Sequence, residues 1–204
     1  MIDLEISDAG LWTVTINRPE KANSLTEAML EDLVDIATRA QDARGLILTG
    51  TGKVFSAGAD LEEARAGLAT STVWERLSTT LADLTCLKVA ALNGTLAGGA
   101  NGMALACDIR LAVPGAKFFY PVMKLGYLPQ PSDAKRMAAL IGPARTKMIL
   151  AAGQKIEAPE ACAWGLVDRL VAPEDLMEQA RDLMSDALAA KPEIATGILQ
   201  MCRG

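Results

Sequence analysis

Short apolar runs of strand type alternate with helical patterns along much of the 204-residue chain. The strand-type runs occupy residues 2–6, 11–16, 46–49, 89–92 and 109–113. The helical patterns occupy residues 24–40, 61–84, 133–141, 143–152, 159–164 and 174–190. Strands that alternate with helices are typical of an α/β fold with mostly parallel strands, and the last third of the chain is predicted to be helical.

Two helix starts have recognisable sequence signals. Ser24-Leu25-Thr26-Glu27 matches a capping box, so Ser24 is the predicted N-cap of the first helix. Ser132 is the predicted N-cap of the helix over residues 133–141. Residues 7–10 carry turn formers between the first two strands and predict a β-hairpin.

The chain contains no histidine. A Ser-His-Asp or Cys-His nucleophilic mechanism and a His-ligated zinc site are therefore excluded. Any group that transfers a proton must be Asp, Glu, Lys, Tyr or Cys.

Charge and cysteine usage limit the partners and the compartment. The net charge is −5 and the cations form no run, which argues against binding to nucleic acid or to an acidic membrane. The four cysteines form no C-x-x-C pair, as expected in a reducing cytosol. The N-terminus lacks the pattern of a signal peptide, and no apolar window reaches the about 18 residues of a membrane span. We expect a cytoplasmic protein.

Two glycine-rich segments fail the nucleotide-binding fingerprints. The spacing of Gly94, Gly98, Gly99 and Gly102 is not that of a dinucleotide fold, and residues 50–53 lack P-loop spacing. Two interpretations remain open. The glycines permit close packing of a helix on a strand, or they expose backbone N–H groups after Gly98 and in the loop at residues 57–59, which could form an oxyanion hole.

Several motifs occur in a recognisable order along almost the whole chain. The central ones are Phe55–Leu61, Ala90–Gly94 with Gly98–Gly99, Ala106–Arg110 and Lys124–Pro129. The flanking ones are Ile16–Leu25, Leu48–Gly52 and Ala161–Asp168. Together they resemble the motifs of the crotonase superfamily, the enoyl-CoA hydratase/isomerase family.

This resemblance implies a crotonase-type spiral of ββα units with a short helical C-terminal region. It implies an acyl-CoA thioester in a bent groove, with coenzyme A as part of the substrate and no separate cofactor or metal. The thioester carbonyl would be held by the backbone N–H groups of Ala59 and Gly99. The residues that the resemblance assigns to substrate binding are Lys21, Ala22, Leu25, Ala57, Asp60, Leu61, Gly102, Pro121 and Val122.

The sequence departs from the family at two catalytic positions. Family hydratases carry one glutamate after the glycine-rich turn and another after a later proline; here these positions are Gly102 and Val122, which follows Pro121. Neither side chain titrates, so ordinary hydratase chemistry is not expected. Two hypotheses remain: an enzyme that isomerises, decarboxylates or cleaves an acyl-CoA through a backbone oxyanion hole, or a non-catalytic acyl-CoA-binding or partner protein.

Other side chains could replace the glutamates. Asp133 is a candidate, although a helix-capping role is the favoured interpretation. Tyr120 and Tyr127 could supply a phenolic proton, but packing with an exposed hydroxyl is favoured for both. A solvated helix face is favoured for three acidic residues, Glu62, Glu63 and Glu75.

The chain is predicted to divide into a core domain at residues 1–190 and a short C-terminal tail at residues 191–204. Family members usually continue with further helices that pack on a neighbouring subunit and close the acyl pocket. We therefore expect a more open groove and a homotrimer weakened by the missing helices.

Overall fold

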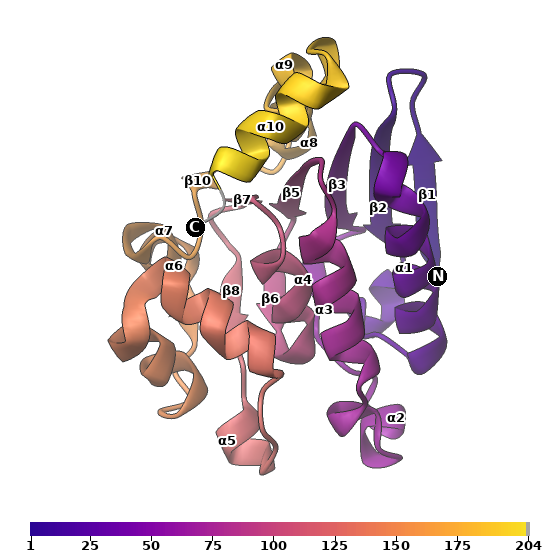
Figure 1. The fold of residues 1–204 in the computed structure, drawn as a ribbon. Coiled ribbons are helices and arrows are strands. Elements are labelled where there is room, and N and C mark those ends of the chain that lie inside the picture. Colours follow the sequence, from indigo (N-terminus) through magenta and orange to yellow (C-terminus); the bar gives the residue numbers. More distant parts are fainter. Residues whose placement is uncertain (203–204) are drawn as a thin grey trace.

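The structure, a computed structural model, describes residues 1–202 and contains two sheets (Figure 1). The six-stranded sheet has the order β1 (Ile2–Ile6), β2 (Leu11–Ile16), β3 (Gly45–Gly50), β5 (Leu87–Leu92), β7 (Ile109–Ala112) and β10 (Arg169–Leu170). The four-stranded sheet has the order β4 (Val54–Ser56), β6 (Thr95–Ala97), β8 (Lys117–Phe119) and β9 (Ile156–Glu157). Only β1 with β2 and β8 with β9 pair antiparallel; the other pairs are parallel. The predicted α/β class with mostly parallel strands is confirmed.

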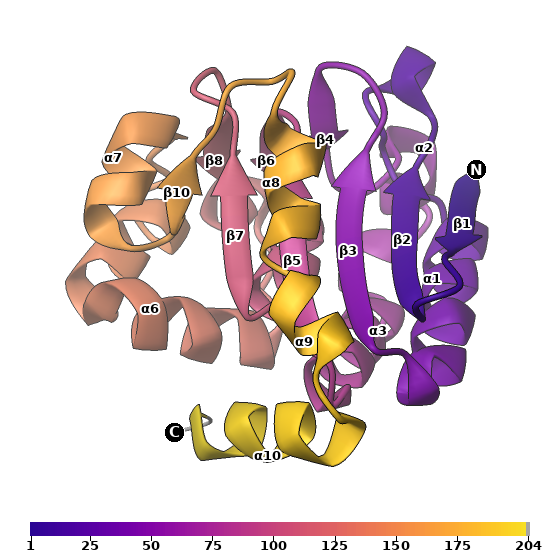
Figure 2. The ribbon, with the colours of Figure 1, turned by 90° about the horizontal axis from the view of Figure 1, so that it is seen from above.

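Helices cover the six-stranded sheet on both faces, with α8 in front of it and α1 and α3 behind it in Figure 2. The α-helices are α1 (Glu27–Arg39), α2 (Leu61–Arg65), α3 (Val73–Asp83), α4 (Asn101–Leu105), α5 (Val122–Leu125), α6 (Pro131–Leu150), α7 (Ala158–Trp164), α8 (Leu176–Asp182), α9 (Ser185–Ala189) and α10 (Pro192–Cys202). The described residues also form four 3-10 helices: η1 (Pro19–Lys21), η2 (Ala40–Asp42), η3 (Leu68–Thr70) and η4 (Gly98–Ala100). This double cover explains why β3 and β5 are mostly apolar and are buried along almost their whole length.

The first predicted helix start is wrong by two residues. Thr26 is the N-cap of α1, and its hydroxyl oxygen accepts a hydrogen bond from the Met29 N–H at 3.2 Å. Ser24 instead lies in the preceding loop, where its carbonyl and hydroxyl oxygens accept hydrogen bonds from Arg18. The sequence contains the capping signal, but Ser24 bonds to Arg18 and therefore does not cap the helix.

Helix continuity also differs from the prediction. The single helix expected over residues 61–84 is wrong, because Gly67 with φ +119° separates α2 from the segments that follow. Conversely, the two helices expected at 133–141 and 143–152 run together as α6, with a kink where Gly142 is non-helical. Ser132 is not the N-cap of α6: Gln130 has that position, and Pro131 begins the helix.

The C-terminal segment is helical as well. The predicted helix over residues 174–190 is divided into α8 and α9, and α10 occupies most of the predicted tail. The last two residues of that tail, 203 and 204, lie outside the described residues. In the described part of the chain, no helix combines the length and the apolar composition needed to cross a membrane. The division into a core domain and a tail stays a prediction.

The two ends of the molecule differ. In Figure 1, α2 and α5 project from one end, whereas α10 lies at the opposite end. The end that carries α2 and α5 is also where the chain leaves β4 and β6, two strands of three residues each that were not predicted. The candidate site lies at this end.

Candidate active site

Two loops meet at the carboxyl ends of β4 and β6. The strands pair in parallel, with Val54 opposite Thr95, so the loops that follow them lie on the same side. Gly58 has φ +90°, and a β-carbon there would lie 2.9 Å from the carbonyl oxygen of Ala97. Gly98 has φ +59°, and a β-carbon there would lie 3.7 Å from the Cα atom of Gly58. The loops can touch because neither glycine carries a side chain.

The contact brings the backbones of Ala59 and Gly99 to the wall of one cavity. The N–H groups of Gly58 and Asp60, on either side of Ala59, both donate hydrogen bonds within the protein. Within residues 1–202, by contrast, the Ala59 N–H has no acceptor. Gly99 is the second residue of η4, and the first N–H groups of a helix have no acceptor within it. The two backbone groups predicted from the motifs are therefore neighbours, with N–H groups free to bind an oxygen atom.

Trp74 on α3 explains why position 99 is a glycine. A β-carbon at Gly99 would lie 2.9 Å from two carbon atoms of the Trp74 ring. The indole N–H donates to the carbonyl oxygen of Leu68 at 2.8 Å, which fixes the ring. Trp74 is not among the residues predicted for the site, although it lines the same cavity.

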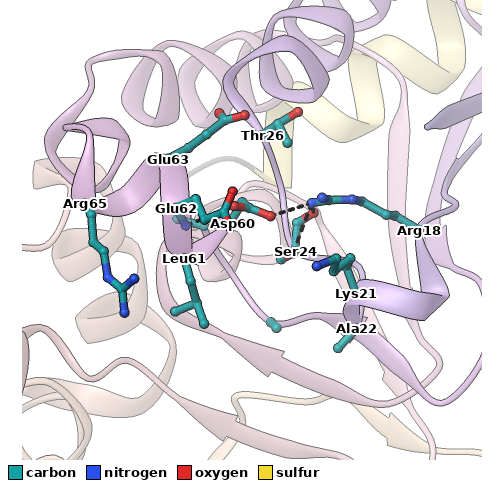
Figure 3. A pocket seen from close by; sticks show the side chains of 12 residues that line it. Arg18, Lys21, Ala22, Ser24, Thr26, Asp60, Leu61, Glu62, Glu63 and Arg65 are labelled. Carbon is teal, nitrogen blue, oxygen red and sulfur yellow. Dashed lines mark hydrogen bonds and ion pairs between the residues drawn. The ribbon is translucent and has the colours of Figure 1, made fainter.

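The first cavity, called here the outer cavity, has a volume of about 580 Å³ and is lined mostly by polar and charged residues (Figure 3). Its lining residues are Arg18, Lys21, Ala22, Ser24, Thr26, Ala57, Ala59, Asp60, Leu61, Glu62, Glu63 and Arg65. Across it, Arg18 Nη1 lies 2.8 Å from Asp60 Oδ2, with the two side chains 21% and 14% exposed. The hydrogen bond from Arg18 lowers the pKa of Asp60 below its usual value. This ion pair links the loop before α1 to the start of α2.

The loop that carries Lys21 is held in a left-handed conformation. Ala22 has φ +51° and Asn23 has φ +54°, which is unfavourable for Ala. Asn23 is fully buried, and its side-chain amide donates to the carbonyl oxygens of Thr51 and Val54 at 2.9 and 2.7 Å. These bonds fix Lys21 and Ala22 at the cavity wall. Asn23 is another positioning residue that was not predicted.

The second cavity, called here the inner cavity, has a volume of about 400 Å³ and mostly apolar walls. Its lining residues are Ala57, Ala59, Leu61, Ala64, Arg65, Ala69, Trp74, Ala97, Gly98, Gly99, Phe119, Tyr120, Pro121, Val122, Leu125, Tyr127, Leu128 and Gln130. Four residues line both cavities: Ala57, Ala59, Leu61 and Arg65. The two cavities therefore adjoin at the free N–H group of Ala59.

A buried carboxylate lies behind the inner cavity. Asp133 on α6 is fully buried, and its Oδ2 atom accepts a hydrogen bond from the Tyr120 hydroxyl at 3.0 Å. Asp133 lies in the first turn of α6, and the Tyr120 side chain is buried with its hydroxyl bonded. The sequence interpretation of Asp133 as an acidic residue at a helix N-terminus is confirmed, but its carboxylate also bonds to Tyr120. The favoured interpretation of Tyr120, with an exposed hydroxyl, is wrong.

Burial determines the protonation of this pair. It raises the pKa of Asp133 to about 7; the hydrogen bond from Tyr120 opposes this rise and the nearby Glu75 carboxylate adds to it. Burial, with the charge of Asp133 as a smaller cause, raises the pKa of Tyr120 far above its usual value. Tyr120 therefore keeps its proton at neutral pH, whereas Asp133 exchanges between its two forms there.

Comparison with known proteins identifies the family. Residues 7–201 match the family described as Enoyl-CoA hydratase/isomerase. The chain belongs to the enoyl-CoA hydratase/isomerase family. Its α/β fold is that of solved members of this crotonase superfamily, so the family and the fold predicted from the sequence are both confirmed.

Three relatives show how far the similarity extends. YngF of Bacillus subtilis is 39% identical over 192 residues, which cover 89% of this chain and 73% of YngF. The 1,2-epoxyphenylacetyl-CoA isomerase of Escherichia coli is 30% identical over 205 residues, covering 95% of this chain and 78% of the isomerase. The crystal structure of the enoyl-CoA hydratase of Bacillus anthracis has a TM-score of 0.88 and 32% identity, covering 98% of this chain and 81% of the hydratase. Relatives named as a hydratase and as an isomerase both match, so family membership alone does not select the reaction.

In this enoyl-CoA hydratase/isomerase family member, two predicted site residues line neither cavity. Leu25 is fully buried; its N–H donates to the Gly58 carbonyl and its own carbonyl accepts from Asp60, so it supports the loop from behind. Gly102 is buried on α4, and a β-carbon there would lie 2.6 Å from Asp133 Oδ1. The other predicted residues line one cavity or both.

The structure also gives the positions of the remaining acidic and phenolic candidates. Glu62 and Glu63 line the outer cavity, and Tyr127 lines the inner one. Glu75 accepts a hydrogen bond from the Ser132 hydroxyl at 2.9 Å. Across residues 1–202, no three His, Cys, Asp or Glu side chains are grouped so that they could hold a metal ion.

Proposed function

We propose that the chain binds an acyl-CoA thioester across the two cavities and stabilises its enolate with the N–H groups of Ala59 and Gly99. The observation that carries this proposal is the pair of free N–H groups at the place where a polar and an apolar cavity adjoin. A thioester bound there could place its nucleotide part in the outer cavity and its acyl chain in the inner one. Its carbonyl oxygen would then lie beside Ala59.

The charges of the outer cavity support this orientation. Arg18, Lys21 and Arg65 provide cations for the phosphates of coenzyme A. Arg18 is already paired with Asp60, so Lys21 is the cation that we assign to the diphosphate. The inner cavity offers aromatic and aliphatic side chains for the acyl chain.

The inner cavity favours a reaction other than hydration. Val122 lines it with an apolar side chain, and Gly102 contributes no side chain at all. Water addition to a conjugated double bond needs a base for the water and an acid for the α-carbon, and neither position supplies one. We infer isomerisation, decarboxylation or thioester cleavage. Decarboxylation needs least, because loss of carbon dioxide generates the enolate without a base.

A non-catalytic acyl-CoA-binding or partner protein is the second candidate. A second observation favours it: positions 102 and 122 carry no ionisable group. The two candidates predict the same binding and differ in turnover. A cytoplasmic location and assembly as a homotrimer remain predictions alongside both.

A substrate panel tests the proposed function. Crotonyl-CoA, a 3-enoyl-CoA and a malonyl-type CoA would be incubated with the protein at high concentration and followed by mass spectrometry. We expect isomerisation, decarboxylation or release of free coenzyme A, and no hydration of crotonyl-CoA. If every thioester binds and returns unchanged, the non-catalytic candidate replaces the enzyme.

The oxyanion hole is tested by Ala59→Pro, which removes one N–H group. Loss of one such donor lowers the rate by about 10²–10³-fold. Thermal unfolding and binding of free coenzyme A show whether the variant is folded. A folded Ala59→Pro variant with the wild-type turnover rate would contradict the assignment.

A further inference from the structure

Asp133 is the buried ionisable side chain whose bonding is incomplete. Its Oδ1 atom is buried and has no hydrogen-bond partner among residues 1–202. A buried polar atom without a partner costs free energy, and a carboxylate costs more than a neutral group. Such an atom in a native structure therefore calls for an explanation.

Two other buried charged side chains, Lys88 and Arg110, have hydrogen-bond and ion-pair partners. The Lys88 ammonium group bonds to two backbone carbonyls and lies 3.0 Å from Asp108. The Arg110 guanidinium bonds to the carbonyl of Leu166 and pairs with Asp168 at 2.8 Å. Both cations tie segments together. Asp133 instead has one neutral donor, Tyr120, and one oxygen with none.

The free oxygen of Asp133 occupies the space in front of Gly102. Because a β-carbon at position 102 would lie 2.6 Å from it, a side chain there and the Asp133 carboxylate exclude each other. The family resemblance expects a catalytic carboxylate to arise from position 102. The structure places a carboxylate beside that position from a different helix, α6.

Tyr120 connects this carboxylate to the acyl site. It lines the inner cavity, together with Gly99 and Val122, while its hydroxyl donates to Asp133. No other ionisable side chain both lines the inner cavity and bonds to a buried carboxylate in the described part of the chain. Tyr120 therefore contacts both the inner cavity and the buried carboxylate.

We propose that Tyr120 and Asp133 form the proton-transfer pair for the α-carbon of the bound acyl group. Tyr120 is the catalytic residue, and Asp133 is a positioning residue that stores the proton behind it. This inference rests on the proposed function, because it needs a thioester whose carbonyl oxygen is held by Ala59 and Gly99. It goes beyond that function by naming the group that takes up and returns the proton.

The transfer balances in both directions. With Asp133 ionised, the C–H bond at the α-carbon breaks and its electron pair forms the enolate. The proton goes to the Tyr120 oxygen while the phenolic proton of Tyr120 passes to Asp133, so Tyr120 is unchanged and Asp133 becomes neutral. The reverse transfer forms a C–H bond on the enolate and ionises Asp133 again. When loss of carbon dioxide has made the enolate, only the reverse transfer is used, and water restores the proton of Asp133.

The ionisable groups that face Asp133 allow it to work near neutral pH. They are Tyr120, Glu75 on α3 and Arg136 on its own helix. Burial and Glu75 raise the pKa of Asp133, whereas Tyr120, Arg136 and the Ser78 hydroxyl lower it, and the result is about 7. A proton-storing group with a pKa near the working pH is present in both of its forms, which suits transfer in both directions.

Exchange of the α-protons of butyryl-CoA in D2O tests the pair without assuming an overall reaction. Mass spectrometry follows deuterium uptake, and calorimetry measures butyryl-CoA binding in parallel. We expect wild-type exchange, a loss of about 100-fold or more in Asp133→Asn and in Tyr120→Phe, and unchanged affinity. The double variant should be no slower than either single variant, because the two residues act as a unit. The matched control is Asp32→Asn, an exposed residue on α1.

The pH profile separates proton storage from mere packing. Exchange by the wild type should rise as pH passes through about 7, where Asp133 ionises, and then level off. In Asp133→Asn this rise should be absent. Tyr120→Phe, which removes only a hydroxyl group, keeps the test valid if Asp133→Asn unfolds.

Two other outcomes are informative: one would overturn the Tyr120–Asp133 pair alone, and the other would overturn the proposed function as well. A wild-type protein that binds butyryl-CoA without exchange, or variants that exchange at the wild-type rate with the wild-type pH profile, would overturn the pair and leave acyl-CoA binding intact. A wild-type protein that does not bind butyryl-CoA would overturn the proposed function, and the pair with it.

Discussion

Asp60 and Asp133 lie beside the two adjoining cavities, and their surroundings differ in almost every respect. Asp60 borders the outer cavity and pairs with Arg18 at 2.8 Å, which lowers its pKa. Asp133 lies behind the inner cavity and has Tyr120 as a neutral donor, and burial raises its pKa to about 7. The outer carboxylate is therefore ionised at neutral pH, and the inner one titrates there.

This contrast shows how one residue type serves two purposes. An ionised Asp60 stabilises a loop contact and leaves a polar wall suited to a charged ligand part. An Asp133 that can gain and lose a proton destabilises the fold when it ionises, but its titration provides proton exchange next to an apolar cavity. The contrast predicts opposite responses to pH and to mutation.

The largest expected effect is on the free energy of unfolding of Asp133→Asn. Because the folded pKa of Asp133 is raised, wild-type stability is greatest below the unfolded value of about 3.9 and is lost as pH rises through about 7. Asparagine cannot ionise, so the variant should be about 1–4 kcal/mol more stable than wild type at pH 8, with no advantage at pH 4. Urea unfolding at both pH values measures this. Equal differences at the two pH values would show that Asp133 does not titrate in the fold.

The next effect is a loss of stability in Gly102→Ala. The new β-carbon would lie 2.6 Å from Asp133 Oδ1, so we expect a loss of about 1–3 kcal/mol. Adding Asp133→Ala should recover part of this loss, since it removes the atoms that clash. Gly115→Ala is the control, because nothing lies within 4 Å of its β-carbon position. Additive effects of the two substitutions would mean that the side chains do not share this space.

A smaller effect is expected in the outer cavity from Lys21→Met. One exposed charge pair is worth up to about 1 kcal/mol, so coenzyme A should bind about two- to fivefold more weakly. Calorimetry at low and high salt measures the affinity, and the difference should shrink as salt screens the charges. Lys147→Met, an exposed position on α6, should leave the affinity unchanged. An effect of Lys21→Met that is independent of salt would argue against phosphate binding there.

The smallest effect should come from Asp60→Asn. Because the folded pKa of Asp60 is lowered, its stabilising contribution is present above the unfolded value of about 3.9 and is lost as pH falls through the folded value. The variant should therefore melt slightly below wild type at pH 7, and the two melting curves should converge in acid. A difference that grows in acid would reverse the sign that we assign to this pair.

The outer cavity could largely be predicted from the sequence, whereas the group behind the inner cavity could not. Lys21, Ala22 and Asp60 belong to contiguous motifs that are recognisable in the sequence, and all three line the outer cavity. Asp133 and Tyr120 are 13 residues apart, and their contact depends on how the start of α6 folds back onto the segment that follows β8. The local pattern correctly places Asp133 at the start of a helix, but only the tertiary packing shows its bond to Tyr120.

The same physical reason applies to the fold. Long apolar strands such as β3 and β5 have a clear pattern and were predicted. The strands β4, β6 and β8 have three residues each, too few for a periodic signal, so the second sheet was missed. Yet β4 and β6 lead directly to Ala59 and Gly99. A shorter element can thus be the one that positions the site.

The most direct test is a structure of the protein with bound butyryl-CoA. We predict the nucleotide in the outer cavity, the thioester oxygen within hydrogen-bond distance of the N–H groups of Ala59 and Gly99, and Tyr120 as the ionisable side chain nearest to the α-carbon. A thioester oxygen bound away from both N–H groups, or another ionisable side chain within about 4 Å of the α-carbon in place of Tyr120, would contradict the account.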